Sequence, residues 1–184
     1  MKKSNIEAML EFNRKFVENK EYKNYSSEKV PSKKIAILSC MDARLTEILQ
    51  DALNLKNGEA HVIKNAGAVI SHPFGSVMRS LLVAVYQLEV EDIVVIGHYD
   101  CGMQGLDCSK LTGKMLERGI EKEELDFVSR HGVDLSSWLR GFEKVEDAVR
   151  DSCSVIKRHP LIPKDVRIHG FIMDPVTGKL DKIE

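Results

Sequence analysis

Two short, uninterrupted apolar runs constrain the fold of this chain more than any other feature of its sequence. One is Ile35-Ala-Ile-Leu-Ser39 and the other is Ile93-Val-Val-Ile96. Runs of this length are typical of strands that are covered on both faces, and such strands belong to parallel sheets with helices on either side. We therefore expect both runs at the centre of an α/β sheet.

The rest of the chain alternates between helical and extended patterns. The expected helices cover 45–53, 77–88 and 145–156, and the further expected strands cover 61–64, 166–173 and the residues near Leu180. A tight turn over 175–178 precedes the last strand. This order predicts an α/β fold in which a mostly parallel central sheet is flanked by helices and ends in a C-terminal antiparallel edge strand.

Glycine and proline residues predict where the helices end. Asn57-Gly58 would close the first helix of the core, and Pro160 would end the last one. The charged stretch 110–140 is also helix-prone, and we expect breaks in it at Gly113, Gly119 and Gly132.

The N-terminal segment has a character of its own. Its apolar residues recur at helical spacing within a charged stretch, and polar residues 19–32 follow before the core begins. The members of this apolar stripe are Ile6, Met9, Leu10, Phe16 and Val17. A chain of 184 residues with 43% hydrophobic content has the size of one domain. We therefore expect residues 1–32 to form a helical arm that packs on a partner subunit, and residues 33–184 to form the α/β domain.

Charge and cysteine content exclude several classes of protein. The chain has 27 basic and 28 acidic residues, a formal net charge of -1, so nucleic acid is not an expected partner. No segment approaches the ~20 apolar residues of a membrane span, so no membrane association is expected. The 4 cysteines are too few and too scattered for a disulfide-stapled module. The composition predicts a cytoplasmic protein with free thiols.

Three zinc-type ligands follow the two central runs. Cys40 comes directly after the first, and His98 and Cys101 follow the second. Ligands of open α/β sheets bind beyond the carboxyl ends of the strands, so two neighbouring strands would bring these side chains into one crevice. Zinc prefers four tetrahedral ligands, and three protein ligands leave one position for water, which zinc ionises near neutral pH. The pattern predicts a catalytic Zn2+ site.

An acidic and a basic residue, Asp42 and Arg44, lie within four residues of Cys40. A carboxylate held ionised by a guanidinium could accept a hydrogen bond from the zinc-bound water. It could instead enter as a fourth ligand and close the site, and the sequence leaves both states open. Taken alone, Asp42 is also a typical N-cap for a helix that begins near Ala43.

The other cysteines and histidines carry no clear chemistry. Cys108 and Cys153 are interpreted as packing residues, and the histidines at 131, 159 and 169 as surface or turn residues. His61 and His72 could relay a proton or could be plain loop residues. A cysteine phosphatase would need an arginine six positions after Cys40, where the chain has threonine, and no phosphate-binding glycine loop is present.

Together these motifs resemble the β-class carbonic anhydrases over roughly residues 33–183. Cys40-Met-Asp-Ala-Arg44 resembles the Cys-x-Asp-x-Arg motif of that family, and His98-Tyr-Asp-Cys101-Gly102 resembles its His-x-x-Cys-Gly motif. Lys64-Asn-Ala-Gly67 is similar to the family's loop after the second strand, with lysine where arginine is common. Asp174-Pro-Val-Thr-Gly-Lys-Leu180 resembles its closing strand-turn-strand.

The resemblance implies a function and an assembly. The implied zinc ligands are Cys40, His98 and Cys101, and the implied catalytic dyad is Asp42 with Arg44. The implied enzyme is a carbonic anhydrase, which hydrates carbon dioxide reversibly to bicarbonate and a proton by a zinc-bound hydroxide. The implied assembly is a homodimer or a multiple of dimers with active sites at the subunit interface. Two alternatives stay open: a hydrolase of carbonyl sulfide or carbon disulfide, and a non-catalytic zinc or thiol sensor.

Overall fold

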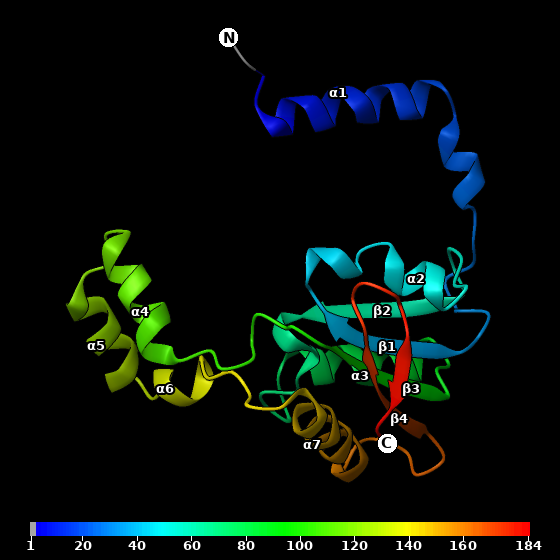
Figure 1. The fold of residues 1–184 in the computed structure, drawn as a ribbon. Coiled ribbons are helices and arrows are strands. Elements are labelled where there is room, and N and C mark those ends of the chain that lie inside the picture. Colours follow the sequence, from blue (N-terminus) through cyan, green and yellow to red (C-terminus); the bar gives the residue numbers. More distant parts are fainter. Residues whose placement is uncertain (1–2) are drawn as a thin grey trace.

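Five strands form one sheet with the order β2-β1-β3-β4-β5 (Figure 1). The computed structural model describes residues 3–184. The strands are β1 (Ile35–Cys40), β2 (Ala60–Asn65), β3 (Asp92–His98), β4 (Arg167–Met173) and β5 (Leu180–Lys182). The first four run parallel, and β5 is antiparallel to β4. The predicted α/β fold with an antiparallel C-terminal edge is confirmed.

Helices connect the strands and also extend beyond the sheet. The α-helices are α1 (Asn5–Glu18), α2 (Ile48–Ala52), α3 (Ser76–Gln87), α4 (Cys108–Glu117), α5 (Lys122–Arg130), α6 (Leu135–Trp138) and α7 (Val145–Arg158). The short 3-10 helices are η1 (Glu21–Tyr25), η2 (Ala43–Leu45) and η3 (Ala66–Ala68). Figure 1 shows α7 below the sheet and α2 above it. The sheet therefore has helical cover on both faces.

The two apolar runs lie at the centre of the sheet, as expected. β1 pairs with β2 on one side and with β3 on the other, and Leu38 and Val95 have no exposed surface. α7 packs directly on β3 and β4, where a Cβ atom added to Gly97 or Gly170 would lie within 2.9 Å of a methyl group of Val149. These two glycines allow the close approach of the helix to the sheet.

We expect the substitution Gly170→Ala to destabilise the fold. The added Cβ would lie 2.8 Å from a Val149 methyl group and 3.1 Å from the Cys153 sulfur, so α7 would have to move. Overpacking of this kind costs about 1–3 kcal/mol. Urea denaturation should show a lower midpoint for this variant. The control is Gly113→Ala, at a helical position with no neighbouring atom within 4 Å, which should not lower the midpoint.

Two predicted helix boundaries were wrong. The segment expected to be one helix over 45–53 is divided between η2 and the short α2, which ends at Ala52 because Asn54 adopts a left-handed backbone with φ of 49°. Asn57-Gly58 lies in the following turn. Gly113 lies inside α4 rather than at a break, whereas Gly119 and Gly132 do separate helices, both with left-handed backbones.

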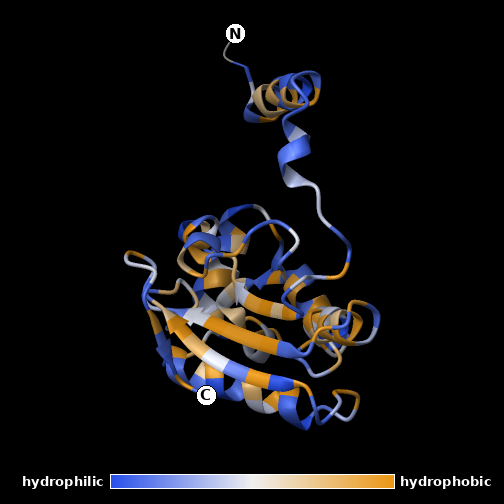
Figure 2. Cartoon of the chain, turned by 90° about the vertical axis from the view of Figure 1, so that its right-hand side faces the viewer, coloured by the Kyte–Doolittle hydropathy of each residue, from blue (hydrophilic) through white to orange (hydrophobic). Residues whose placement is uncertain are grey.

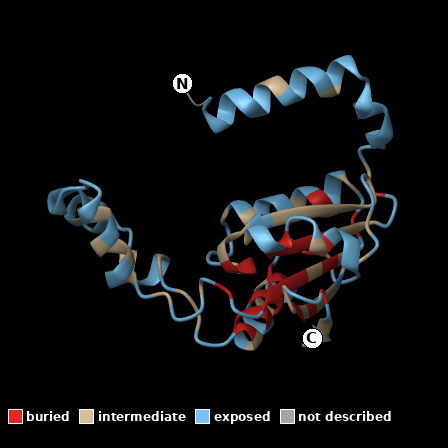
Figure 3. Cartoon of the chain, turned by 45° about the horizontal axis from the view of Figure 1, so that its top comes forward, coloured by how far each residue is buried: buried red, intermediate tan, exposed pale blue. Residues whose placement is uncertain are grey.

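Two parts of the chain project away from the sheet. α1 forms an arm, and α4, α5 and α6 form a separate helical lobe (Figures 1 and 3). None of these four helices contains a buried residue. Within residues 3–184, no helix combines the length and the apolar character needed to cross a membrane. Within the lobe α4 and α6 contact each other, whereas α1 leaves most of its apolar residues exposed.

Candidate metal centre

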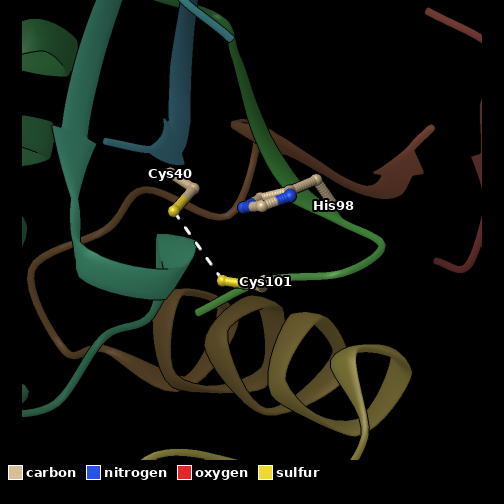
Figure 4. Close-up of side chains that lie close together, drawn as sticks. All are labelled: Cys40, His98 and Cys101. Atoms are coloured by element: carbon tan, nitrogen blue, oxygen red, sulfur yellow. Dashed lines mark hydrogen bonds between the residues drawn. The ribbon is translucent and has the colours of Figure 1, made fainter. Parts of the chain in front are cut away.

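The adjacency of β1 and β3 brings the predicted ligands together. The two strands pair in parallel register up to Ser39 and Ile96, so Cys40 and His98 both lie at the carboxyl edge of the sheet. Asp100 then turns the chain with a left-handed backbone, φ 54°, and Cys101 points back toward Cys40 (Figure 4). The positions that the motifs occupy in the sequence therefore converge because their strands are neighbours.

The three side chains form one compact, buried group. The two sulfur atoms of Cys40 and Cys101 lie 3.9 Å apart, and these sulfurs and a ring nitrogen of His98 all lie within 4.8 Å of one another (Figure 4). All three residues are buried. His98 Nδ1 lies 2.9 Å from the Tyr99 carbonyl oxygen, which requires the proton on Nδ1, so the lone pair of Nε2 faces the cysteines.

The donor set fits zinc. Two thiolates that are each about 2.3 Å from a zinc ion at tetrahedral angles are about 3.8 Å apart, which matches the observed sulfur separation of 3.9 Å. In the described part of the chain, His98 Nε2 is buried without a hydrogen-bond partner, as expected of a nitrogen reserved for a metal. Zinc at this position would satisfy that buried nitrogen and neutralise the charge of the thiolates.

The surroundings favour ionisation of Cys40. The hydrogen bond from Cys101 lowers the pKa of the Cys40 thiol, and His98 and the backbone N–H of Gly67 lower it further, while burial opposes them. The Gly67 N–H lies 3.3 Å from the sulfur. Gly67 has φ of 84°, a conformation that other residues adopt only at a cost, and it lies in η3 directly after β2. This loop thus directs a backbone N–H at the Cys40 sulfur.

Arg44 holds the Asp42 carboxylate beside the group formed by Cys40, His98 and Cys101. Asp42 Oδ1 accepts from the Arg44 backbone N–H at 2.9 Å and from Nε at 3.0 Å, and Oδ2 accepts from Nη2 at 2.9 Å. The hydrogen bonds of Arg44 lower the pKa of Asp42 to about 2, so the carboxylate is ionised at neutral pH. Oδ2 lies 3.8 Å from His98 Nε2. Asp42 is also the N-cap of η2, as predicted from the sequence, so one side chain both caps this helix and lies beside the cysteines and histidine.

The remaining cysteines and histidines lie outside this group. Cys153 is buried in α7, as expected of a packing residue, and Cys108 is half-buried at the start of α4. His61 pairs with Ala36 at the amino end of the strands, four residues from Asn65 and therefore about 13 Å from the edge that carries the site. His72 accepts a hydrogen bond from Phe74 N in a loop.

The surface-or-turn interpretation of three histidines was right only in part. His131 is exposed at the end of α5. His159 lies at the end of α7 but is buried, with its ring 5.1 Å from that of Phe74. His169 lies within β4 and its Nε2 is 2.9 Å from Asp92 Oδ1. The interpretation of His169 as a surface or turn residue was wrong. Its partner Asp92 begins β3 and is distant in the sequence, so the residue pattern did not indicate this contact.

Fold and site together define an α/β protein with a buried group of two cysteines and one histidine that can bind a metal ion, and an ionised carboxylate beside it. The family model for carbonic anhydrase matches residues 35–180. The chain belongs to the β-class carbonic anhydrase family. It is therefore a carbonic anhydrase, a zinc enzyme that interconverts carbon dioxide and bicarbonate.

Individual relatives agree with this assignment. The chain is 51% identical over 178 residues to the Bacillus subtilis protein YvdA, covering 97% of this chain and 90% of YvdA. It is 35% identical over 153 residues to β-carbonic anhydrase 1 of Mycobacterium tuberculosis, covering 83% of each protein. The crystal structure of a β-carbonic anhydrase from Trichomonas vaginalis superposes with a TM-score of 0.90 at 36% identity, covering 98% of each chain.

A more distant relative has another activity by name. A carbon disulfide hydrolase from Acidithiobacillus thiooxidans is 28% identical over 158 residues, covering 81% of this chain and 76% of that protein. This sequence identity is lower than the 35% and 36% identity to the two β-carbonic anhydrases described above.

Proposed function

We propose that Cys40, His98 and Cys101 hold the zinc ion of this carbonic anhydrase and that Asp42 and Arg44 are its catalytic dyad. The observation that carries the proposal is the convergence of three buried donors beside a carboxylate that is already bound to a guanidinium. This arrangement combines a metal-binding set with a group that only accepts hydrogen bonds at neutral pH.

The chain contributes orientation and charge to the reaction. When bound, zinc lowers the pKa of a coordinated water to near 7. Asp42 Oδ2, close to His98 Nε2, is placed to accept a hydrogen bond from the attacking water, which directs its lone pair toward carbon dioxide. The hydrogen bonds of Arg44 lower the pKa of Asp42 further below neutrality, so the ionised carboxylate accepts hydrogen bonds and donates none. The same carboxylate would be less firmly oriented without the Arg44 side chain, because two of its three hydrogen bonds come from the guanidinium and one from the backbone N–H.

A stopped-flow assay of carbon dioxide hydration tests this function. The purified chain should accelerate hydration when loaded with zinc and should lose this activity after removal of the metal by a chelator. Release of sulfide from carbon disulfide or carbonyl sulfide by the same preparation tests the alternative substrates. Zinc-dependent sulfide release without hydration of carbon dioxide would contradict carbonic anhydrase activity.

We further propose that the enzyme is a homodimer, or a multiple of dimers, in which α1 packs on the partner subunit. The α1 ribbon carries apolar residues between polar ones (Figure 2), and several of these apolar residues, which recur at helical spacing, are exposed in the single chain. They include Ile6, Met9, Leu10, Phe12 and Val17. Exposed apolar faces of this kind mark sites of association. The metal centre also lies near the surface, with Met41 67% exposed, which fits a site that a second subunit covers.

The substitution Phe12→Glu should therefore weaken self-association. Phe12 is 66% exposed on α1, so its replacement should not affect the fold of one chain. A charge buried at a packed interface costs about 2 kcal/mol or more, about a thirtyfold loss of dimer affinity. Sedimentation equilibrium should show dissociation for this variant and none for Arg14→Glu, which lies on the charged side of the same helix. Equal behaviour of the two variants would contradict the arm's role.

We also propose a cytoplasmic location. All four cysteines are free, and the two that would bind zinc must remain reduced thiols. A reducing compartment keeps them so. The location of the tagged protein in intact cells tests this proposal.

A further inference from the structure

Arg44 has a second acidic partner, Asp100, which is neither a zinc ligand nor part of the dyad. Arg44 Nη1 donates to Asp100 Oδ2 at 2.8 Å, and Nη2 donates to the backbone carbonyl of Asp100 at 2.8 Å. On its other side the same guanidinium donates to both carboxylate oxygens of Asp42. The arginine is therefore held between two aspartates that are 58 positions apart in the chain.

The backbone of Asp100 is suited to this contact. Its φ of 54° lies in the left-handed region, which aspartate and asparagine enter more readily than most residues. In this conformation the carbonyl and the carboxylate of one residue reach two different nitrogens of Arg44. A guanidinium has five N–H groups, and with Asp42 and Asp100 together all three of its nitrogens donate.

The position of Asp42 depends on that of Arg44. Both Asp42 oxygens accept hydrogen bonds from Arg44, and its side chain makes no other hydrogen bond in the described part of the chain. The Arg44 side chain is 41% exposed, so protein packing alone does not fix it. A long, exposed side chain has many rotamers, and a second anchor reduces their number. Asp100 supplies that anchor from the loop between two zinc ligands.

We propose that Asp100 is a positioning residue that anchors Arg44 and, through it, holds the Asp42 carboxylate in its orientation beside the metal centre. The inference rests on the proposed function of the Asp42–Arg44 dyad. It assigns to the middle of the His-x-x-Cys segment a role other than spacing the two ligands.

The test uses the zinc-loaded enzyme and two variants of Asp100. Asp100→Gly removes the carboxylate and tolerates the left-handed backbone, whereas Asp100→Asn keeps an acceptor oxygen and the same backbone preference. We expect kcat/KM for carbon dioxide hydration to fall about fivefold in the glycine variant, the factor that corresponds to one exposed ion pair. The asparagine variant should stay within about twofold of the parent. Asp51→Ala, which removes an exposed aspartate of α2, is the control for charge and should leave kcat/KM unchanged.

A double-variant cycle shows whether Asp100 acts through Arg44. In an Arg44→Ala background, Asp100→Gly should cause no further loss of kcat/KM, because the group that it anchors is already absent. The crystal structure of the zinc-loaded Asp100→Gly enzyme should show the Arg44 guanidinium displaced from Asp42, with the zinc content unchanged. This structural readout does not depend on activity, so it distinguishes failure of the inference from failure of the proposed function.

Several results would overturn the inference. Asp100→Gly could lower kcat/KM by the same factor in both backgrounds, could lower the zinc content, or could leave Arg44 in its place. An unchanged kcat/KM in the Asp100→Gly variant would also overturn the inference.

Discussion

The substitution Cys40→Ser will remove most of the bound zinc and with it the hydration activity. Cys40 is one of the three proposed zinc ligands, and serine is a poor ligand for zinc at neutral pH because its hydroxyl stays protonated. Zinc binding by four-ligand sites is worth about 10–16 kcal/mol, so one ligand contributes roughly 3 kcal/mol, about a hundredfold in affinity. After dialysis against a weak chelator, metal analysis should find much less than one zinc per chain, and turnover should fall in proportion.

The matched control is Cys108→Ser. It makes the same chemical change at a half-buried cysteine in α4, outside the metal centre. This variant should retain one zinc per chain and the parental turnover. If Cys40→Ser retained zinc with the parental affinity while folding normally by circular dichroism, Cys40 would not be a ligand.

Replacement of Asp42 by asparagine should separate catalysis from metal binding. Asparagine has the shape of aspartate but no charge, and its amide donates where the carboxylate only accepts. The ionised state of Asp42, whose pKa is lowered to about 2 by Arg44, is therefore lost without removal of any zinc ligand. Groups that accept or transfer a proton at the reacting water contribute about a hundredfold to ten-thousandfold in rate. We expect kcat/KM to fall by about a hundredfold or more, with the zinc content unchanged.

This variant also discriminates between an enzyme and a sensor. A non-catalytic zinc or thiol sensor would have no need of the Asp42 charge, so its metal affinity and thiol oxidation would change little. Asp51→Asn changes an exposed aspartate of α2 outside the metal centre and controls for the change in net charge. A turnover within twofold of the parent in Asp42→Asn would contradict the catalytic role of the dyad.

The sequence predicts that Cys40, His98 and Cys101 come together because each follows a strand that is easily identified. The runs at Ile35–Leu38 and Ile93–Ile96 are apolar on both faces, and the assumption that they are neighbours was confirmed. Once these strands are adjacent, Cys40 and His98 must lie at the same edge of the sheet. The turn at Asp100 then needs only one left-handed residue to return Cys101 to the same point.

The parts of the site that sequence reasoning missed depend on contacts between distant residues. The Gly67 N–H reaches Cys40 because η3 follows β2 at the same edge, and Asp100 reaches Arg44 across the two loops. The spacing of residues in the sequence does not indicate such contacts, since they arise from loop conformation rather than from hydrophobic period. The Lys64-Asn-Ala-Gly67 motif marked the loop, but only the structure shows that its amide points at a sulfur.

The predicted helix over 45–53 was wrong for a similar reason, because the local backbone depends on contacts that hydrophobic period does not report. The apolar period over 45–53 is real, and Leu45 and Leu49 are both buried, but the chain reaches those positions through η2 and α2 rather than through one helix. Burial of the same side chains was therefore predictable, whereas the local backbone was not.

The most direct test is a crystal structure of the zinc-loaded protein with anomalous data collected at the zinc absorption edge. The proposed metal centre predicts one zinc ion per chain, about 2.3 Å from the sulfurs of Cys40 and Cys101 and about 2.0–2.1 Å from Nε2 of His98, with Asp42 still bound to Arg44. Zinc bound elsewhere, or bound to only one of the two sulfurs, would contradict it.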